Sequence, residues 1–110
     1  MLQIKIEERA GSEIVLTLEG QLSEASGIEL MALWKELRRN CPGKACIVDL
    51  AAVGAMDEAG EGAICSLALD GVRFLARGPM LDRTIDLVYR TSVQALQAGC
   101  KGFRSGVFNR

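Results

Sequence analysis

The chain has 110 residues, of which 49% are hydrophobic and 25% are charged, and this ordinary globular composition suffices for one domain. Its 13 basic and 14 acidic residues give a formal net charge of −1, which leaves no excess of positive charge to hold a nucleic acid. The absence of histidine excludes Ser-His-Asp and Cys-His catalytic pairings and every zinc site that contains histidine.

Two strands are predicted near the N-terminus, because apolar and polar residues alternate there with the period of a strand that has one buried face. The first covers residues 2–8 at one edge of the sheet and buries every second side chain from Leu2 to Ile6. The second is marked by the alternation at residues 14–18, and we expect it to stop at Gly20. A Gly-Ser turn between them predicts an antiparallel hairpin.

A helix is predicted from Ser23 to about Asn40, because an apolar i, i+3, i+4, i+7 pattern begins at Leu30 and includes Trp34. Ser23 is a candidate N-cap, and Ser26 begins a sequence match to a capping box. Two arginines near the expected C-terminal end complement the helix dipole. Both ends of this helix therefore carry signals.

The second half of the chain alternates between strands and helices. A nearly continuous apolar run at residues 45–50 predicts a central strand covered on both faces, and a loop follows at residues 51–54. A helix is expected from Asp57 to about Leu69, and a buried strand at residues 72–76. A third helix opens at Pro79, because proline is favoured at the first helical position.

The order β-β-α-β-α-β-α predicts an α/β fold with a mixed sheet of about four strands and helices packed largely on one side. In the third helix Leu81, Ile85 and Val88 share one face. The last residues show no sustained hydrophobic period, so we expect one domain at residues 1–99 and a loose C-terminal tail at residues 100–110.

The cysteines form no CxxC motif and lie in or beside apolar or small-residue stretches, which predicts reduced, mostly packed thiols at Cys41, Cys46, Cys65 and Cys100. No apolar run approaches the roughly 18–20 residues of a membrane span, and the N-terminus lacks the apolar core of a signal peptide. We therefore expect a cytoplasmic protein without a cofactor.

The most informative stretch is a buried strand, a short loop and then two adjacent carboxylates, Asp57 and Glu58, at the start of a helix. Free N–H groups at a helix start attract negative charge, so Asp57 is suited to cap the helix and Glu58 gains from the helix dipole. The same geometry suits a phosphate group.

At these residues the chain resembles STAS domains, the fold of anti-sigma-factor antagonists and of the cytoplasmic tails of sulfate transporters. That family has a buried strand ending in Asp-Leu, a short loop and then Asp-Ser-Ser-Gly. Here the matching residues are Asp49-Leu50 and Asp57-Glu58-Ala59-Gly60. The resemblance extends to residues 18–22 and 71–78, and it covers about residues 2–98.

The resemblance gives position 58 a particular meaning. In the antagonists, a partner anti-sigma kinase phosphorylates the first serine of the motif, and this ends binding. Glu58 stands at that position and cannot accept the phosphoryl group by that chemistry. Its single negative charge only partly imitates a phosphoserine, which carries about −1.5 to −2. Two interpretations stay open: Asp57 and Glu58 both serve the helix start, or Glu58 fixes a switch in one state.

The resemblance also implies a surface that docks the kinase, at the start and on the exposed face of the same helix. That helix is apolar nearly all round, so an internal helix with tight small-residue packing is the alternative interpretation. The predicted docking residues are Asp57, Glu58, Ala59, Gly60, Glu61, Gly62 and Cys65.

Other polar residues give weaker signals. A cation site made by the carboxylates of Asp49, Asp57, Glu58 and Glu61 is disfavoured, because a strand should point Asp49 elsewhere. Four hydroxyl groups remain as substitutes for the missing phosphoacceptor: Ser66, Thr84, Thr91 and Ser92.

We predict a non-catalytic regulatory module, similar to an anti-sigma-factor antagonist, that docks reversibly to a kinase-type anti-sigma factor. The alternative is an accessory STAS subunit that holds the ATPase of a lipid ABC transporter, because a permanently docked subunit needs no switch. Neither interpretation involves nucleic acid or membrane insertion, and a homodimer stays open. An enzyme is disfavoured, because no nucleophile is paired with a base in the sequence.

Overall fold

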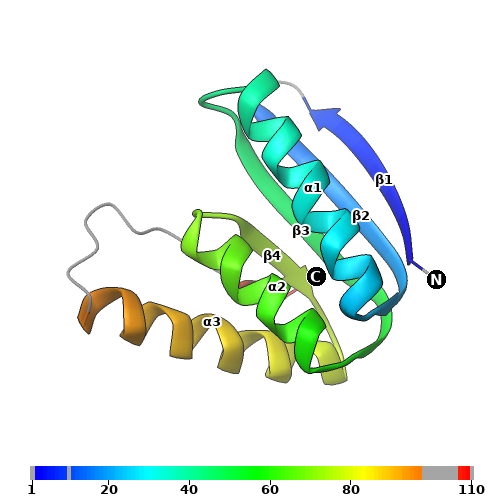
Figure 1. Cartoon of the computed structure of the whole chain (residues 1–110), viewed down its shortest axis with the longest axis vertical. Coiled ribbons are helices and arrows are strands. Elements are labelled where there is room, and N and C mark those ends of the chain that lie inside the picture. Colours follow the sequence, from blue (N-terminus) through cyan, green and yellow to red (C-terminus); the bar gives the residue numbers. More distant parts are fainter. Residues whose placement is uncertain (1, 10, 98–106, 110) are drawn as a thin grey trace.

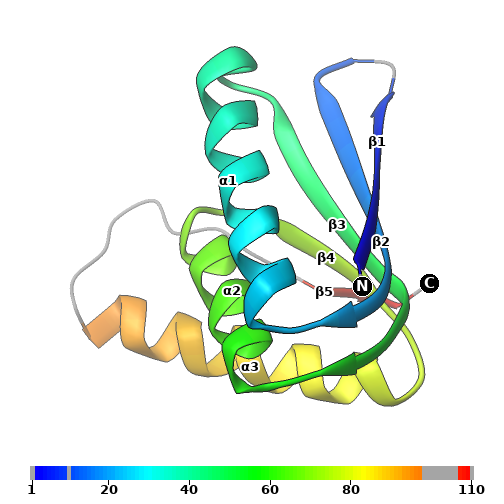
Figure 2. The same ribbon diagram turned by 45° about the vertical axis from the view of Figure 1, so that its right-hand side comes forward.

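The computed structural model, which describes residues 2–9, 11–97 and 107–109, has a five-stranded sheet with three helices on one face (Figure 1). Figure 2 shows the helix layer and the sheet turned by 45°. The elements in chain order are β1 (Leu2–Arg9), β2 (Glu13–Leu22), α1 (Glu24–Asn40), β3 (Ala45–Met56), α2 (Glu58–Leu69), β4 (Arg73–Ala76), α3 (Pro79–Gln97) and β5 (Val107–Asn109).

The sheet is mixed, with strand order β1-β2-β3-β4-β5. β1 pairs antiparallel with β2, and the remaining neighbours pair in parallel. Parallel neighbours need a crossover connection, and α1 and α2 supply it between β2 and β3 and between β3 and β4. The predicted α/β class and the order β-β-α-β-α-β-α are confirmed.

The core lies between the sheet and the helices. It is built from alternate residues of the central strands and from the inward faces of the three helices, to which α3 contributes Leu87 and Val88. Trp34 of α1 belongs to it and is 7% exposed. The large side chains buried most completely are Phe74, Leu16, Leu18, Leu22, Leu30, Leu50, Ile64 and Leu67.

Two predicted strand ends are wrong. β2 does not stop at Gly20 but runs to Leu22, and β3 does not end in a loop at residues 51–54 but runs to Met56. The extra segments pair in parallel, with Leu22 beside Met56, after register shifts around Gly20. Gly20 has a φ of 117°, so it makes an irregularity within the strand that other residues would adopt only with strain.

Three residues of the expected C-terminal tail also join the sheet. Val107–Asn109 form β5, which pairs in parallel with β4, so the loose-tail prediction is wrong for this segment. A strand of three residues is too short to produce a recognisable hydrophobic period, which explains why the sequence pattern missed it. The other residues of the expected tail lie outside the described residues, and the boundary at residue 99 stays a prediction.

Two residues predicted to be buried are exposed. Ile85 of α3 is 47% exposed, because the buried stripe of this helix is centred on Thr84 and Leu87 and a helix turns about 100° per residue. Ile6 on β1 is 52% exposed, because this edge strand lies to the side of the helices and they leave most of its length uncovered (Figure 1). The position of an element in the fold thus overrides its own pattern.

Candidate functional site

The start of α2 is fixed at the point where β3 leaves the sheet. The backbone N–H of Asp57 donates to the carbonyl of Leu22 over 3.1 Å, which ties the turn to the end of β2. The Asp57 side chain then accepts a hydrogen bond from the backbone N–H of Gly60, with a distance of 2.8 Å between Oδ1 and N. Asp57 is therefore the N-cap of α2, as predicted.

Gly60 lets the first turn of α2 pack directly against the end of β2. A β-carbon at this position would come within 2.3 Å of the Leu22 carbonyl oxygen, which is far inside van der Waals contact. Gly60 is buried, so it is not part of an accessible docking surface. Its role in the motif is to permit this close approach, which positions the carboxylates before it.

Glu58 is used differently from Asp57. It is exposed in the first turn of α2, and its carboxylate forms no hydrogen bond or ion pair with any residue that the structure describes. The backbone N–H of Gly60 in this turn already has the Asp57 side chain as its acceptor. The two adjacent carboxylates are thus divided: Asp57 stabilises the helix start, and Glu58 presents a negative charge to solvent beside the positive end of the helix dipole.

The remaining predicted docking residues differ in accessibility. Ala59 and Gly62 are exposed, and Cys65 is partly buried. Glu61 is also partly buried, and its Oε2 accepts from Nε of Arg83 in α3 over 2.9 Å. Glu61 therefore joins two helices of the fold, and Asp57, Glu58, Ala59 and Gly62 make up the exposed part of the predicted surface.

A groove beside this surface was not predicted. It runs between α1 and α2 and has a volume of about 540 Å³. Ile28 and Met31 of α1 line it together with residues of α2 that include Ala59. Ile28 is 66% exposed. It lies outside the apolar pattern that identified α1, and an apolar residue on the polar side of an amphipathic helix is the signal that would have found it.

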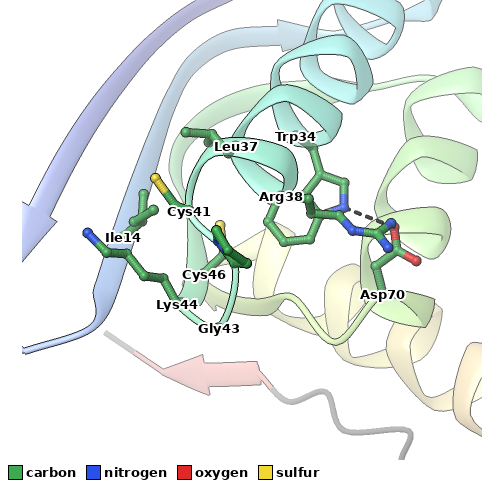
Figure 3. Close-up of a pocket in the computed structure, with 10 residues that line it drawn as sticks. Ile14, Trp34, Leu37, Arg38, Cys41, Gly43, Lys44, Cys46 and Asp70 are labelled. Carbon is green, nitrogen blue, oxygen red and sulfur yellow. Dashed lines mark hydrogen bonds and ion pairs between the residues drawn. The ribbon is translucent and has the colours of Figure 1, made fainter.

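A second hollow lies at the C-terminal end of α1 and has a volume of about 310 Å³ (Figure 3). Oδ2 of Asp70 accepts from the Trp34 indole N–H at 2.9 Å and from Nη1 of Arg38 at 3.0 Å. Cys41 and Cys46 line the same hollow as free thiols. Burial raises the pKa of the Cys46 thiol to about 11, which keeps it protonated near neutral pH.

The other carboxylates discussed as a cation site are engaged separately. Oδ1 of Asp49 accepts from the backbone N–H of Ala51 over 2.9 Å, and Asp49 is 3% exposed in β3. Asp57 caps α2, and Glu61 is paired with Arg83. Within the described ranges, no group of three or more Cys, Asp or Glu side chains is placed to hold a metal ion.

Of the four candidate hydroxyl groups, Ser66 alone is exposed. Thr84 is 0% exposed and Thr91 is 1% exposed. Thr91 donates to the carbonyl of Leu87 over 2.8 Å, and Ser92 donates to the carbonyl of Val88 over 2.9 Å. Ser66 on α2 is thus the accessible member of the set.

None of the described helices has the length and the apolar character that crossing a membrane requires.

The comparisons with known proteins find solved structures that are similar to this chain, but no similar sequence. No protein-family model matches the sequence, and no curated protein matches it. An uncharacterized protein of the DUF3478 family with a SpoIIAA-like fold, from Shewanella loihica, aligns with a TM-score of 0.59 at 14% identity, over 97% of this chain and 85% of that one. The anti-sigma-factor antagonist SpoIIAA, in its unphosphorylated form, aligns with a TM-score of 0.59 at 14% identity, over 86% of this chain and 98% of that one.

An antisigma-factor antagonist STAS domain from Rhodobacter sphaeroides aligns more loosely, with a TM-score of 0.49 at 18% identity, over 96% of this chain and 84% of that one. In the first two alignments at least 85% of each chain is covered, so the likeness extends over most of the sheet and the helices. The fold implied by the sequence resemblance is therefore confirmed, and this chain has the SpoIIAA-like fold of STAS domains.

Proposed function

We propose that this chain is a non-catalytic protein-interaction module that docks reversibly to a kinase-type anti-sigma factor, with Glu58 in place of the phosphoacceptor serine. The observation that carries the proposal is the exposed, unpaired carboxylate of Glu58 beside the Asp57 cap, on the fold of an anti-sigma-factor antagonist. Asp57, Ala59 and Gly62 surround it as accessible parts of the docking surface.

The chemistry of Glu58 determines what the module does. A carboxylate does not take the place of a hydroxyl in the serine-kinase reaction, so transfer to residue 58 does not occur. The carboxylate carries a permanent charge of about −1, where phosphoserine carries about −1.5 to −2. The wild-type chain therefore imitates in part the phosphorylated state, and a kinase-type partner should hold it less tightly than it holds the Glu58→Ser variant before that variant is phosphorylated.

The presence of glutamate instead of serine at position 58 also supports a second function. No residue of the motif at positions 57–60 carries a hydroxyl group. A module without a phosphoacceptor is suited to a permanent complex, such as an accessory STAS subunit on the ATPase of a lipid ABC transporter. In that case Glu58 is a helix-start residue, and its replacement leaves the complex unchanged.

Affinity capture from the native lysate tests the proposal. Tagged wild type, Glu58→Ser and Glu36→Ser are treated with a phosphatase and used as baits in lysate depleted of ATP, so that residue 58 of the variant stays unphosphorylated during the capture. The recovered proteins are identified by mass spectrometry. Glu36 is an exposed carboxylate on α1, so its replacement changes the net charge equally away from the α2 motif. The proposal expects a kinase-type partner with all three baits and more of it with Glu58→Ser. Recovery of a transporter ATPase in equal amounts with all three baits contradicts the proposal. Failure to recover a kinase-type protein with any bait also contradicts it.

A further inference from the structure

The groove between α1 and α2 has an apolar floor next to the proposed docking surface. Its volume is about 540 Å³. The apolar or small residues that line it are Gly27, Ile28, Met31, Ala32, Ala59 and Ala63. Because Ala59 belongs to both, the groove and the exposed part of the α2 motif are continuous.

Small residues keep this groove open. A β-carbon at Gly27 would lie 3.5 Å from the Ala63 β-carbon, so the two helices approach closely without large side chains between them. The residues of α2 that line the groove are Ala59, Ala63 and Ser66, whose side chains are short, and Ile28 is 66% exposed. An isoleucine left in solvent beside an apolar floor favours a partner that covers both.

The two ends of the groove carry opposite charges. Glu24 lines one end and Lys35 the other, and neither forms an ion pair within the described part of the chain. They stand 11 positions apart on α1, which corresponds to about 16 Å along the helix axis, or about three turns. The groove therefore has the length of a short helix and a charge difference along that length.

The directions of α1 and α2 add to the charge difference along the groove. Gly27, in the first turn of α1, faces Ala59 and Ala63 in the first half of α2, so the two helices begin at the same end of the groove. Glu58 precedes Ala59 and stands at this end as well. A third helix packed antiparallel to both would place its negative C-terminal dipole end beside their two positive N-terminal ends.

From these observations we infer that the groove binds one amphipathic helix of the partner protein, antiparallel to α1 and α2. The apolar side chains of that helix, at i, i+3 or i+4, and i+7, lie on Ile28 and the alanine floor. Its acidic N-terminal turn lies over Lys35, and its basic C-terminal turn lies over Glu24. This order of charges also stabilises the bound helix itself. The inference rests on the proposed function, since it names the partner segment that meets the Glu58 end of α2.

Two synthetic peptides of about 14 residues, cross-linked to hold a helix, test the inference. They share one leucine stripe and one composition; the first has acidic residues in its first turn and basic residues in its last, and the second has them exchanged. Binding is measured by fluorescence polarisation. We expect the first peptide to bind about tenfold more tightly than the second, because two attractive pairs replace two repulsive ones.

Variants of the protein locate the binding. Ile28→Asp should weaken binding of the first peptide by tenfold or more, whereas Ile85→Asp, which changes a 47% exposed isoleucine on α3, should leave it unchanged. The double variant Glu24→Lys/Lys35→Glu should reverse the preference between the peptides. Circular dichroism verifies that each variant is folded. Equal affinity for both peptides, no binding of either, or full binding by Ile28→Asp overturns the inference.

The failure of this inference is distinguishable from the failure of the proposed function. Glu58→Ser tests the function by the partners that it recovers, and it leaves the apolar floor intact. If Ile28→Asp still captures the kinase-type partner as wild type does, the groove assignment is wrong and the function stands. If both peptides bind as expected but no kinase-type partner is recovered, the groove stands and the function is wrong.

Discussion

The α-carbon of Gly60 packs so closely on the carbonyl of Leu22 that a β-carbon there would lie 2.3 Å from the oxygen. This contact holds the first turn of α2 against the end of β2, and it places Glu58 at the surface. Because both partners in the contact are backbone, neither can move aside without shifting its element.

Gly60→Ala should therefore destabilise the fold, by about 2–3 kcal/mol, because the added methyl group overpacks a backbone contact. Gly62→Ala is the matched control, since a β-carbon there meets no atom within 4 Å. In the control, alanine should stabilise α2 by about 0.5–1 kcal/mol. Urea unfolding followed by circular dichroism measures both. Equal stability of the two variants contradicts the packing described for Gly60.

The division between the two carboxylates predicts different stabilities for their alanine variants. Asp57→Ala should lose about 1 kcal/mol, because the Gly60 N–H loses its acceptor, which lies 2.8 Å away. Asp57→Asn should keep most of the stability, because asparagine caps a helix about equally well. Glu58→Ala should change stability less than Asp57→Ala does, because no described residue depends on its carboxylate. Thermal unfolding of the three variants provides the comparison, and a larger loss for Glu58→Ala would reverse the assignment.

The Trp34–Asp70 hydrogen bond can be followed by fluorescence, because the chain has one tryptophan. Asp70→Ala should lose about 1–2 kcal/mol, since the Trp34 indole N–H, 2.9 Å from Oδ2, is left in a largely buried position without this acceptor. It should also shift the emission of Trp34. Arg38→Ala removes the more exposed partner of Asp70 and should change both readouts less. Unchanged emission in Asp70→Ala would contradict the contact.

Burial of Cys46 predicts a loss of stability in alkali. Its pKa is raised from 9.0 to about 11 in the folded protein. Above pH 9 the unfolded chain loses this thiol proton while the folded chain keeps it, so stability falls as the pH rises from about 9 to about 11. The loss attributable to this one group is about 2 kcal/mol.

Comparison of urea unfolding at neutral pH and at about pH 10.5 measures that loss. The difference between wild type and Cys46→Ala removes the contribution of other groups that titrate in this range. Cys65→Ala, which changes a partly buried thiol on α2, is the control and should keep the wild-type decline. A decline of equal size in Cys46→Ala would show that another group causes it.

The sequence predicted those features that depend on neighbouring residues. The alternation in β1 and β2, the apolar stripe of α1 and the Asp57 cap are local signals, and they located the helices and the first four strands. The predictions were wrong for strand segments that form only through pairing with another strand. β3 continues to Met56 because β2 pairs alongside it, and β5 exists because β4 offers it a free edge.

The same distinction applies to the candidate site. Adjacent carboxylates at a helix start are visible in the sequence, but only their contacts distinguish the capping Asp57 from the free Glu58. The sequence also does not show that Glu61, one of the predicted docking residues, pairs with Arg83, which lies 22 residues later and 2.9 Å away in the structure. Ile28 is visible in the sequence as an apolar residue on the polar side of α1, but the groove beside it also requires Ala59 and Ala63 of α2.

The measurement that tests the central claim most directly is the location of phosphate on the Glu58→Ser variant. Wild type and variant are expressed in the native host, purified and mapped by peptide mass spectrometry. A docking module whose acceptor serine has been replaced by Glu58 predicts phosphate at residue 58 of the variant and none on that peptide of the wild type. An unphosphorylated residue 58 in the variant, together with an identical set of bound proteins, would contradict the account.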